Sequence, residues 1–199
     1  MKVGMIFECG PEGADKKVCE YLARKLLPDI EISSVTLDNK SKLISECGNA
    51  AAVLLGHDCE RIVIVWDLYP SWREKGQNPC RKEDRENIAR SLLETGITSP
   101  NVYLVCIEQE LEAWLLADGR AVSQYLSSDA HKVKVKHRKN AEKVNNPKGR
   151  LKKLFEEHGK DYNEAIHAQK IIRALPDFER IKKCTTFVRF AVKATGKTP

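Results

Sequence analysis

Residues 61–66 read Arg-Ile-Val-Ile-Val-Trp, a run of β-branched and apolar side chains with no polar alternation. A strand that is covered on both faces of a parallel sheet has this continuously apolar character. Residues 101–107, Asn-Val-Tyr-Leu-Val-Cys-Ile, predict a second buried strand, residues 2–7 a short one, and residues 30–37 a weaker, alternating one. The chain therefore predicts four strands around one buried core.

Segments with helical spacing of apolar residues separate and follow these strands. They cover residues 18–27, 40–55, 82–94 and 108–116. A regular alternation of strand and helix is typical of an α/β fold, so we expect a mainly parallel central sheet flanked by helices. Later helical patterns lie at residues 120–126, 147–158, 161–174 and 176–194. We therefore expect an α/β domain over residues 1–118 and a helical, basic C-terminal subdomain over residues 119–199 packed on it.

The positive charge of the chain is concentrated in one segment. The 199 residues hold 34 Lys and Arg against 28 Asp and Glu, a formal charge of +6. Residues 131–153 hold ten of these basic residues and a single acid, Glu142, which makes +9 and leaves −3 for the remainder. Basic side chains that neutralise phosphates give salt-dependent, sequence-independent binding of nucleic acid.

We expect the basic segment to contact DNA or RNA. Between residues 131 and 136 lysine alternates with valine, so a strand or an extended hairpin there would present its charges on one face. The nucleic-acid contacts that we expect in this segment are Lys132, Lys134, Lys136, Arg138, Lys148 and Arg150. The alternative is a solvated surface loop without a partner.

An acid directly follows three of the predicted strands: Glu8, Asp67 and Glu108. The carboxyl ends of parallel strands share one edge of a sheet, and ligands bind in the crevice outside that edge. Glu112 shares a helix face with Glu108 if a helix begins at Glu108. Clustered carboxylates favour a hard cation, so we expect Mg²⁺ or Mn²⁺ on Glu8, Asp67, Glu108 and Glu112. The alternative is that these acids only stabilise helix N-termini.

Metal-bound carboxylates at a sheet edge suit phosphoryl transfer. The metal offsets phosphate charge and lowers the pKa of a bound water, and a further carboxylate can move a proton. Arg81 and Arg85 follow the loop after Asp67 and are candidates to hold a phosphate, although pairing with nearby acids explains them equally well. Trp72, in the same loop, is a candidate to stack on a base or to cover the crevice, with loop packing as the alternative.

Three short motifs resemble a Toprim-like family, similar to the Toprim domains of OLD-family and RloB-like proteins of bacterial defence loci. They are Glu-Cys-Gly-Pro-Glu-Gly-Ala-Asp at residues 8–15, Val-Trp-Asp at 65–67 and Glu-Leu-Glu-Ala-Trp-Leu-Leu-Ala-Asp at 110–118. Residues 184–190, Cys-Thr-Thr-Phe-Val-Arg-Phe, also resemble the C-terminal helix of that family.

This resemblance implies a Toprim fold with Mg²⁺-dependent phosphodiester chemistry. Glu8 would act as general acid or base, Asp67 would bind metal and Glu112 would complete the site. It also implies a role in antiviral defence with a separate ATPase, because the chain has no P-loop sequence of its own. The chain departs from the family in having one acid at Asp67-Leu68-Tyr69 rather than Asp-x-Asp, and in having Cys9 between Glu8 and Gly10.

Other protein classes have little support in the sequence. The seven cysteines show no Cys-x-x-Cys spacing and the five histidines no His-Glu-x-x-His, so neither a redox motif nor a zinc hydrolase is indicated. Apolar runs are too short to span a bilayer, and no signal peptide is recognisable, so we expect a cytoplasmic protein without membrane contact. We expect a metal-dependent endonuclease; the alternative is a non-catalytic nucleic-acid-binding, regulatory or partner-docking module that retains an acidic edge.

Overall fold

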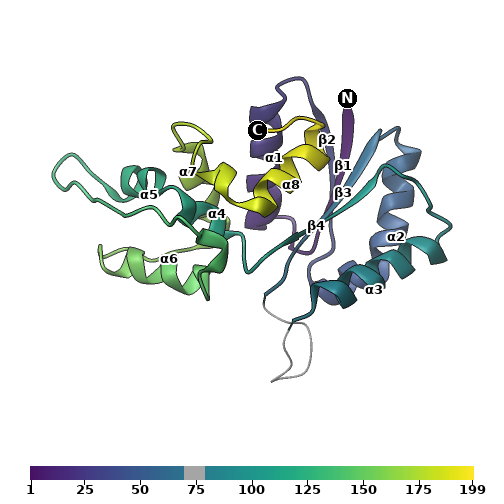
Figure 1. The fold of residues 1–199 in the computed structure, drawn as a ribbon, viewed down its shortest axis with the longest axis horizontal. Coiled ribbons are helices and arrows are strands. Elements are labelled where there is room, and N and C mark those ends of the chain that lie inside the picture. Colours follow the sequence, from purple (N-terminus) through teal and green to yellow (C-terminus); the bar gives the residue numbers. More distant parts are fainter. Residues whose placement is uncertain (70–78) are drawn as a thin grey trace.

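The computed structural model describes residues 1–69 and 79–199. The predicted α/β class is confirmed: four strands form one parallel sheet in the order β2-β1-β3-β4 (Figure 1). The strands are β1 (Lys2–Phe7), β2 (Glu31–Thr36), β3 (Arg61–Asp67) and β4 (Val102–Ile107). The apolar run at residues 61–66 forms β3, which lies between β1 and β4 in the middle of the sheet.

Eight α-helices occur in the described part of the chain. Three lie between the strands: α1 (Ala14–Leu26), α2 (Lys40–Gly56) and α3 (Arg81–Glu94). Five follow β4: α4 (Glu112–Ala117), α5 (Gly119–Leu126), α6 (Pro147–Glu156), α7 (Glu164–Arg173) and α8 (Thr185–Thr195). Short 3-10 turns, η1 (Ala141–Lys143) and η2 (Ile181–Lys183), precede α6 and α8.

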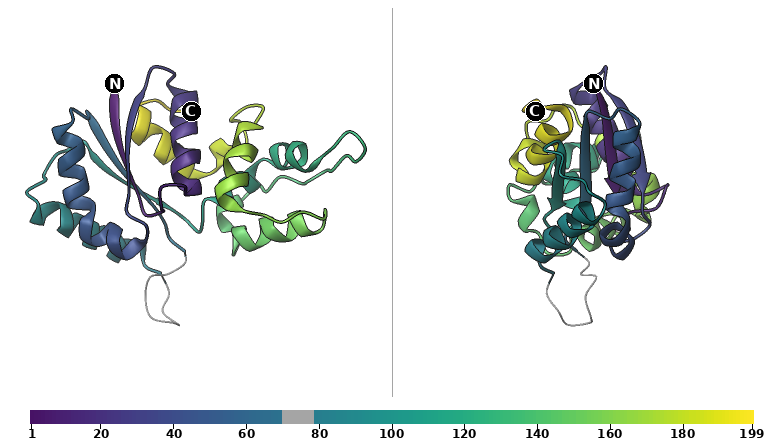
Figure 2. Two further views of the ribbon diagram at one scale, coloured as in Figure 1. Left: turned by 180° about the vertical axis from the view of Figure 1, so that it is seen from behind. Right: turned by 90° about the vertical axis from the view of Figure 1, so that its right-hand side faces the viewer.

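Helices cover both faces of the sheet, which explains the continuously apolar strands. Ile62, Ile64 and Trp66 of β3 pack on one face with α2 and α3, and Val63 and Val65 pack on the other face with α1 and α8. Figure 2 shows these two layers on opposite sides of the sheet. Alternation of side chains along a strand therefore divides the core into two layers.

The helices after β4 continue the core on the α1 side. Trp114 of α4, Phe155 of α6 and Phe187 of α8 are fully buried in the same cluster as Val63 and Val65. α4 to α7 extend from one side of the sheet, whereas α8 returns and lies against β4 and α1 (Figure 1). The segment after residue 118 thus shares its hydrophobic core with the α/β unit.

Three local predictions were wrong. The alternating segment 131–136 forms no strand, although its lysines are exposed and its valines are buried or half-buried, as the alternation predicted. Its backbone bonds instead to two serine hydroxyls: Val133 N donates to Ser127 Oγ, just after α5, at 2.9 Å, and Val135 N to Ser123 Oγ of α5 at 2.8 Å. The helix expected over residues 176–194 is divided into η2 and α8, because Cys184 is extended. The helix expected from Glu108 begins instead at Glu112.

The seven cysteines are free thiols. Within the described residues, no helix combines the length and apolar character that crossing a bilayer requires.

Candidate functional site

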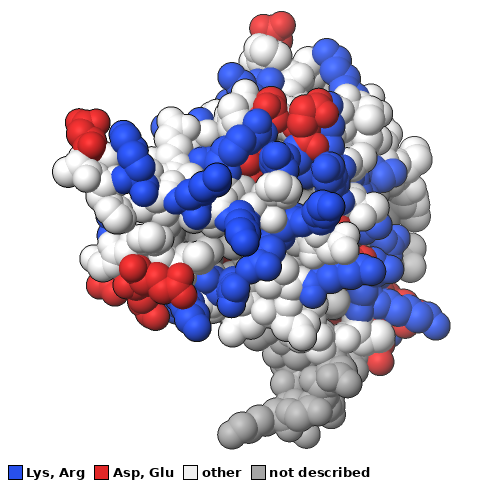
Figure 3. Space-filling view, turned by 60° about the vertical axis from the view of Figure 1, so that its left-hand side comes forward, with Lys and Arg blue, Asp and Glu red and all other residues white. Residues whose placement is uncertain are grey.

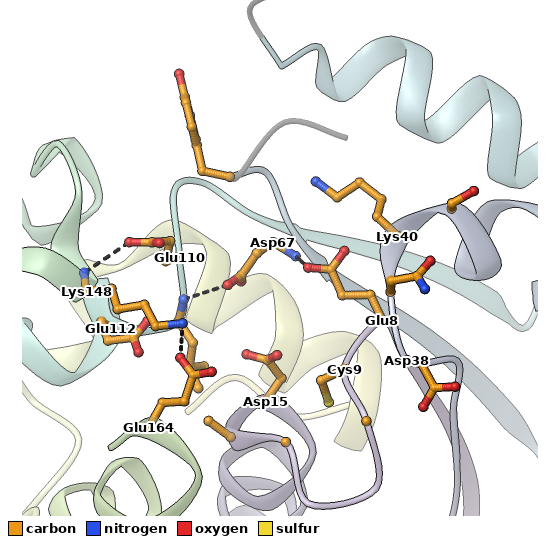
Figure 4. Close-up of a pocket in the computed structure, with 17 residues that line it drawn as sticks. Glu8, Cys9, Asp15, Asp38, Lys40, Asp67, Glu110, Glu112, Lys148 and Glu164 are labelled. Carbon is orange, nitrogen blue, oxygen red and sulfur yellow. Dashed lines mark hydrogen bonds and ion pairs between the residues drawn. The ribbon is translucent and has the colours of Figure 1, made fainter. Parts of the chain in front are cut away.

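A cavity of about 510 Å³ opens at the carboxyl edge of the sheet (Figure 4). Its lining, among the described residues, includes seven acids: Glu8, Asp15, Asp38, Asp67, Glu110, Glu112 and Glu164. Glu8 follows β1 and Asp67 ends β3. Because β1 and β3 are parallel neighbours with Phe7 opposite Val65, these two acids are brought side by side. Asp15 comes from the first turn of α1 and Glu112 from the first turn of α4.

Glu8 and Asp67 each accept one hydrogen bond from a backbone amide, and the second carboxylate oxygen of each has no partner among the described residues. The amide of Asp67 donates to Glu8 Oε1 at 3.1 Å, and the amide of Leu111 donates to Asp67 Oδ2 at 3.2 Å. The other two oxygens, Glu8 Oε2 and Asp67 Oδ1, are buried and have no hydrogen-bond partner among the described residues. Buried polar atoms in native proteins nearly always have a partner, so an unpaired one requires an explanation such as a bound ion.

Four carboxyl groups of the cavity, those of Glu8, Asp15, Asp67 and Glu112, have raised pKa values. Withdrawal from water raises the pKa of Glu8 from 4.5 to about 7 and that of Asp15 from 3.8 to about 7. The same cause raises the pKa of Asp67 well above its usual range, and the charges of Asp15 and Glu8 raise it further. Burial also raises the pKa of Glu112. A bound divalent cation would favour the ionised forms of these carboxyl groups and so act against both the burial and the repulsion.

Glu112 is held from the C-terminal half of the chain. Tyr162, just before α7, donates its hydroxyl to Glu112 Oε1 at 3.1 Å, and both side chains are buried. Burial and the neighbouring Glu112 carboxylate raise the pKa of the Tyr162 hydroxyl far above its usual range, so that it stays a donor. Residue 112 is thereby fixed by a residue 50 positions away.

Two lysines bring positive charge to the rim of the acidic cavity. Lys148, in the first turn of α6, forms an ion pair with Glu164 and lowers the pKa values of Asp15 and Glu112. On the opposite side, Lys40 at the start of α2 donates to the carbonyl of Leu68 at 3.1 Å (Figure 4). Three helices, α1, α2 and α6, begin at residues in or beside the lining, so their positive N-terminal ends face the cavity.

Glu108 and the two predicted phosphate-binding arginines lie outside this cavity. Glu108 Oε1 is 2.7 Å from Arg81 Nη1 in an ion pair, and Arg85 is exposed on α3. Glu108 does not share a helix face with Glu112 because Gln109 adopts φ 109°, which turns the chain before α4 begins. The expected convergence of Glu108 with the other acids was therefore wrong. Trp72 lies outside the described residues.

The basic residues predicted to bind nucleic acid divide into two groups. Lys148 lines the acidic cavity, whereas the others are exposed: Lys132, Lys134, Lys136, Arg138 and Arg150. Figure 3, in which the side of α5 to α7 comes forward, shows Lys and Arg spread across that face with smaller acidic groups between them. Basic side chains spread over a face in this way could contact successive phosphates of a nucleic acid lying on that face.

Sequence reasoning missed Asp15, Lys40, Tyr162 and Glu164. In the sequence Asp15 has the position of an ordinary acid in a first helical turn. A lysine at the start of a helix is usually exposed, whereas Lys40 is buried. Tyr162 and Glu164 meet the site only through packing of α7. Of these four residues, only Asp15 could have been singled out from the sequence, because it is the last residue of the motif at residues 8–15.

The residues fit a magnesium-type ion in part. No group of three His, Cys, Asp or Glu side chains among residues 1–69 and 79–199 is close enough to enclose an ion. However, Mg²⁺ commonly takes only one or two protein carboxylates and keeps several waters. The unpaired oxygens of Glu8 and Asp67 match that limited donor set.

The parallel sheet and the polar cavity at its carboxyl edge define an open α/β protein with a cavity at the strand ends, the place where proteins of this architecture bind ligands. The chain belongs to the family described as Domain of unknown function (DUF4276), whose model matches residues 12–193. Asp15, Asp67, Glu112 and Lys148 lie within the matched part, and Glu8 precedes it. Comparison with curated proteins and with solved structures gave no match.

Proposed function

We propose that the acidic cavity binds Mg²⁺ or Mn²⁺ and cleaves phosphodiester bonds of nucleic acid. One observation carries this proposal: Glu8 Oε2 and Asp67 Oδ1, at the ends of neighbouring parallel strands, are buried acceptors without partners. A cation between them would give both oxygens a partner and favour the ionised carboxylates, which burial disfavours.

The surrounding residues take distinct roles in this chemistry. Glu8 and Asp67 hold the ion, which when bound supplies charge neutralisation of the phosphate and activation of a water. The pKa of about 7 belongs to Glu8 in the metal-free cavity, and a bound cation would lower it and keep the carboxylate ionised. The role of Glu8 as general acid or base is what the Toprim resemblance implies. Lys148, Lys40 and the N-termini of α1, α2 and α6 orient the phosphate.

Nucleic acid is the substrate class that the surface favours. The exposed lysines and arginines of residues 131–153 belong to the same segment of the chain as Lys148, which lines the cavity, so we expect a polyanion held on them to reach it. The resemblance of residues 8–15, 65–67 and 110–118 to Toprim domains supports the same chemistry. By that resemblance the proposal extends to antiviral defence alongside a separate ATPase.

A second candidate is a non-catalytic nucleic-acid-binding, regulatory or partner-docking module that retains an acidic edge. Two observations favour it. Asp67 is followed by Leu68 and Tyr69 rather than by a second acid, and no three-residue ligand group occurs in the described residues. In this alternative the basic surface does the binding and the cavity has no reaction to perform.

A nuclease assay with matched variants distinguishes the two. Labelled single- and double-stranded DNA and RNA are incubated with wild type, Glu8→Gln, Asp67→Asn and Glu94→Gln, in Mg²⁺, Mn²⁺ or EDTA. Glu94 is exposed on α3, outside both the cavity and the basic segment, and serves as the control. We expect EDTA-sensitive cleavage that falls roughly 100-fold or more in the two cavity variants and is unchanged in the control.

Two results would contradict the proposal. Cleavage of equal rate in wild type and both cavity variants would place the reaction elsewhere. Binding of nucleic acid without cleavage under every metal and substrate would favour the non-catalytic module.

A further inference from the structure

A second cavity, of about 390 Å³, adjoins the acidic one. Its lining residues are Tyr69, Gln109, Glu110, Asn145 and Asn146. Tyr69 and Glu110 line both cavities, so the two share a wall. A ligand whose phosphate occupies the acidic cavity would therefore place its next chemical group in the second one.

The second cavity has the chemistry of a nucleobase site rather than a phosphate site. Its described lining combines one aromatic ring with three amide side chains and contains no Lys or Arg. Amides both donate and accept hydrogen bonds, as the edge of a base requires. Its one acid, Glu110, already accepts a hydrogen bond at Oε2 from the amide of Lys148 at 3.0 Å.

The side chain of Tyr69 lines the second cavity and is exposed, so its ring is available for a base to stack on. It is 37% exposed, one of four large apolar side chains with high exposure among the described residues. Its backbone is fixed beside the extension of β4: Leu68 N donates to the carbonyl of Ile107 at 2.9 Å and Tyr69 N to that of Gln109 at 3.0 Å. An exposed ring on a fixed backbone binds the flat face of a base with little loss of entropy.

Two of the three amide residues hold unusual backbone conformations. Gln109 has φ 109° and Asn146 has φ 50°. Asparagine tolerates positive φ, and Asn146 Oδ1 accepts from Gly149 N at 2.8 Å at the start of α6, but glutamine at such a φ is strained. Residues in rare conformations cluster at ligand-binding sites, and here both border the same cavity.

We propose that this second cavity binds an unpaired nucleobase, stacked on Tyr69 and recognised at its edge by the amides of Gln109, Asn145 and Asn146. A base in a duplex has its faces stacked and its edge paired, so the site selects single-stranded or locally opened nucleic acid. The inference rests on the proposed function, because the phosphate joined to that base lies in the acidic cavity.

Equilibrium binding in EDTA tests this without cleavage. Fluorescence anisotropy measures the affinity of short labelled DNA and RNA single strands, and of the corresponding duplexes, for wild type, Tyr69→Ala and Tyr69→Phe. We expect wild type to prefer single strands, Tyr69→Ala to lose roughly tenfold or more of that affinity, and Tyr69→Phe to keep it because the ring remains. The DNA and RNA strands show which sugar the site accepts.

The outcomes separate this inference from the proposed function. Equal single-strand affinity of Tyr69→Ala and wild type overturns the base site even if wild type cleaves nucleic acid in Mg²⁺. Equal loss by Tyr69→Ala and Tyr69→Phe overturns stacking as the mode of binding. Single-strand binding that depends on the ring, in a protein that never cleaves, supports the base site and contradicts the proposed chemistry.

Discussion

Replacing Glu8 by Gln should stabilise the metal-free protein above neutral pH. The pKa of Glu8 rises from 4.5 to about 7 on folding, mainly because the side chain is withdrawn from water. Each pH unit between the unfolded and folded pKa values is worth about 1.4 kcal/mol, so ionising Glu8 in the folded protein costs at most about 3 kcal/mol. Glutamine keeps the acceptor for the Asp67 amide and has no charge to bury.

The pH dependence has a definite sign. A carboxyl group with a raised folded pKa binds more protons in the folded state, so its contribution to stability is present below about pH 4.5 and is lost as the pH rises through about 7. The advantage of Glu8→Gln over wild type should therefore be near zero at pH 4.5 and largest at pH 8. For a chain of this size, about 3 kcal/mol corresponds to an increase in Tm of roughly 6–12 °C.

Thermal and urea unfolding in EDTA at pH 4.5, 6 and 8 measure this difference, with Glu94→Gln as the exposed control. Adding Mg²⁺ or Mn²⁺ should stabilise wild type more than Glu8→Gln, because a ligand that binds only the folded state raises its stability. The reasoning is refuted if Glu8→Gln is no more stable than wild type at pH 8 without metal. An advantage that does not change with pH would equally refute the electrostatic explanation.

Two further predictions concern the C-terminal half. Glu142→Gln should lower the free energy of unfolding by about 1–2 kcal/mol. The Glu142 carboxylate accepts hydrogen bonds from the first two backbone amides of α8, those of Thr185 at 2.7 Å and Thr186 at 2.8 Å. An unchanged midpoint of urea unfolding would contradict this prediction. Replacing the three alternating lysines by Gln should reduce the slope of log K against log salt by about 2–3 for nucleic acid, and an unchanged slope would remove the segment from the interface. These lysines are Lys132, Lys134 and Lys136.

The sheet and the centre of the site were predictable from the sequence because both depend on local patterns. A continuously apolar run at residues 61–66 indicates a strand covered on both faces, and it forms the interior strand β3. Glu8 and Asp67 follow strands directly, and parallel strands bring their carboxyl ends together. These two inferences need no knowledge of how distant segments pack.

The remainder of the site depends on contacts that local patterns do not encode. Helical spacing after β4 suggested a continuous helix from Glu108, but the positive φ of Gln109 turns Glu108 away toward Arg81. Lys148 belongs to a basic run that predicts a nucleic-acid contact on the surface, yet packing of α6 against α4 places it among carboxylates. The hydroxyl of Tyr162 meets Glu112 only because α7 packs against α1 and α4.

The dispersion of the site along the chain also sets the order in which it can be assembled during translation. Glu8 and Asp67 leave the ribosome early, but the tyrosine that fixes Glu112 and the partner of Lys148 are residues 162 and 164. Contacts of this sequence separation form only when the later helices have been made, and closing such long loops is the slow part of folding. A nascent chain that ends before residue 164 therefore carries the acidic edge without its complete surroundings, so the cavity is finished only after residue 164 has left the ribosome.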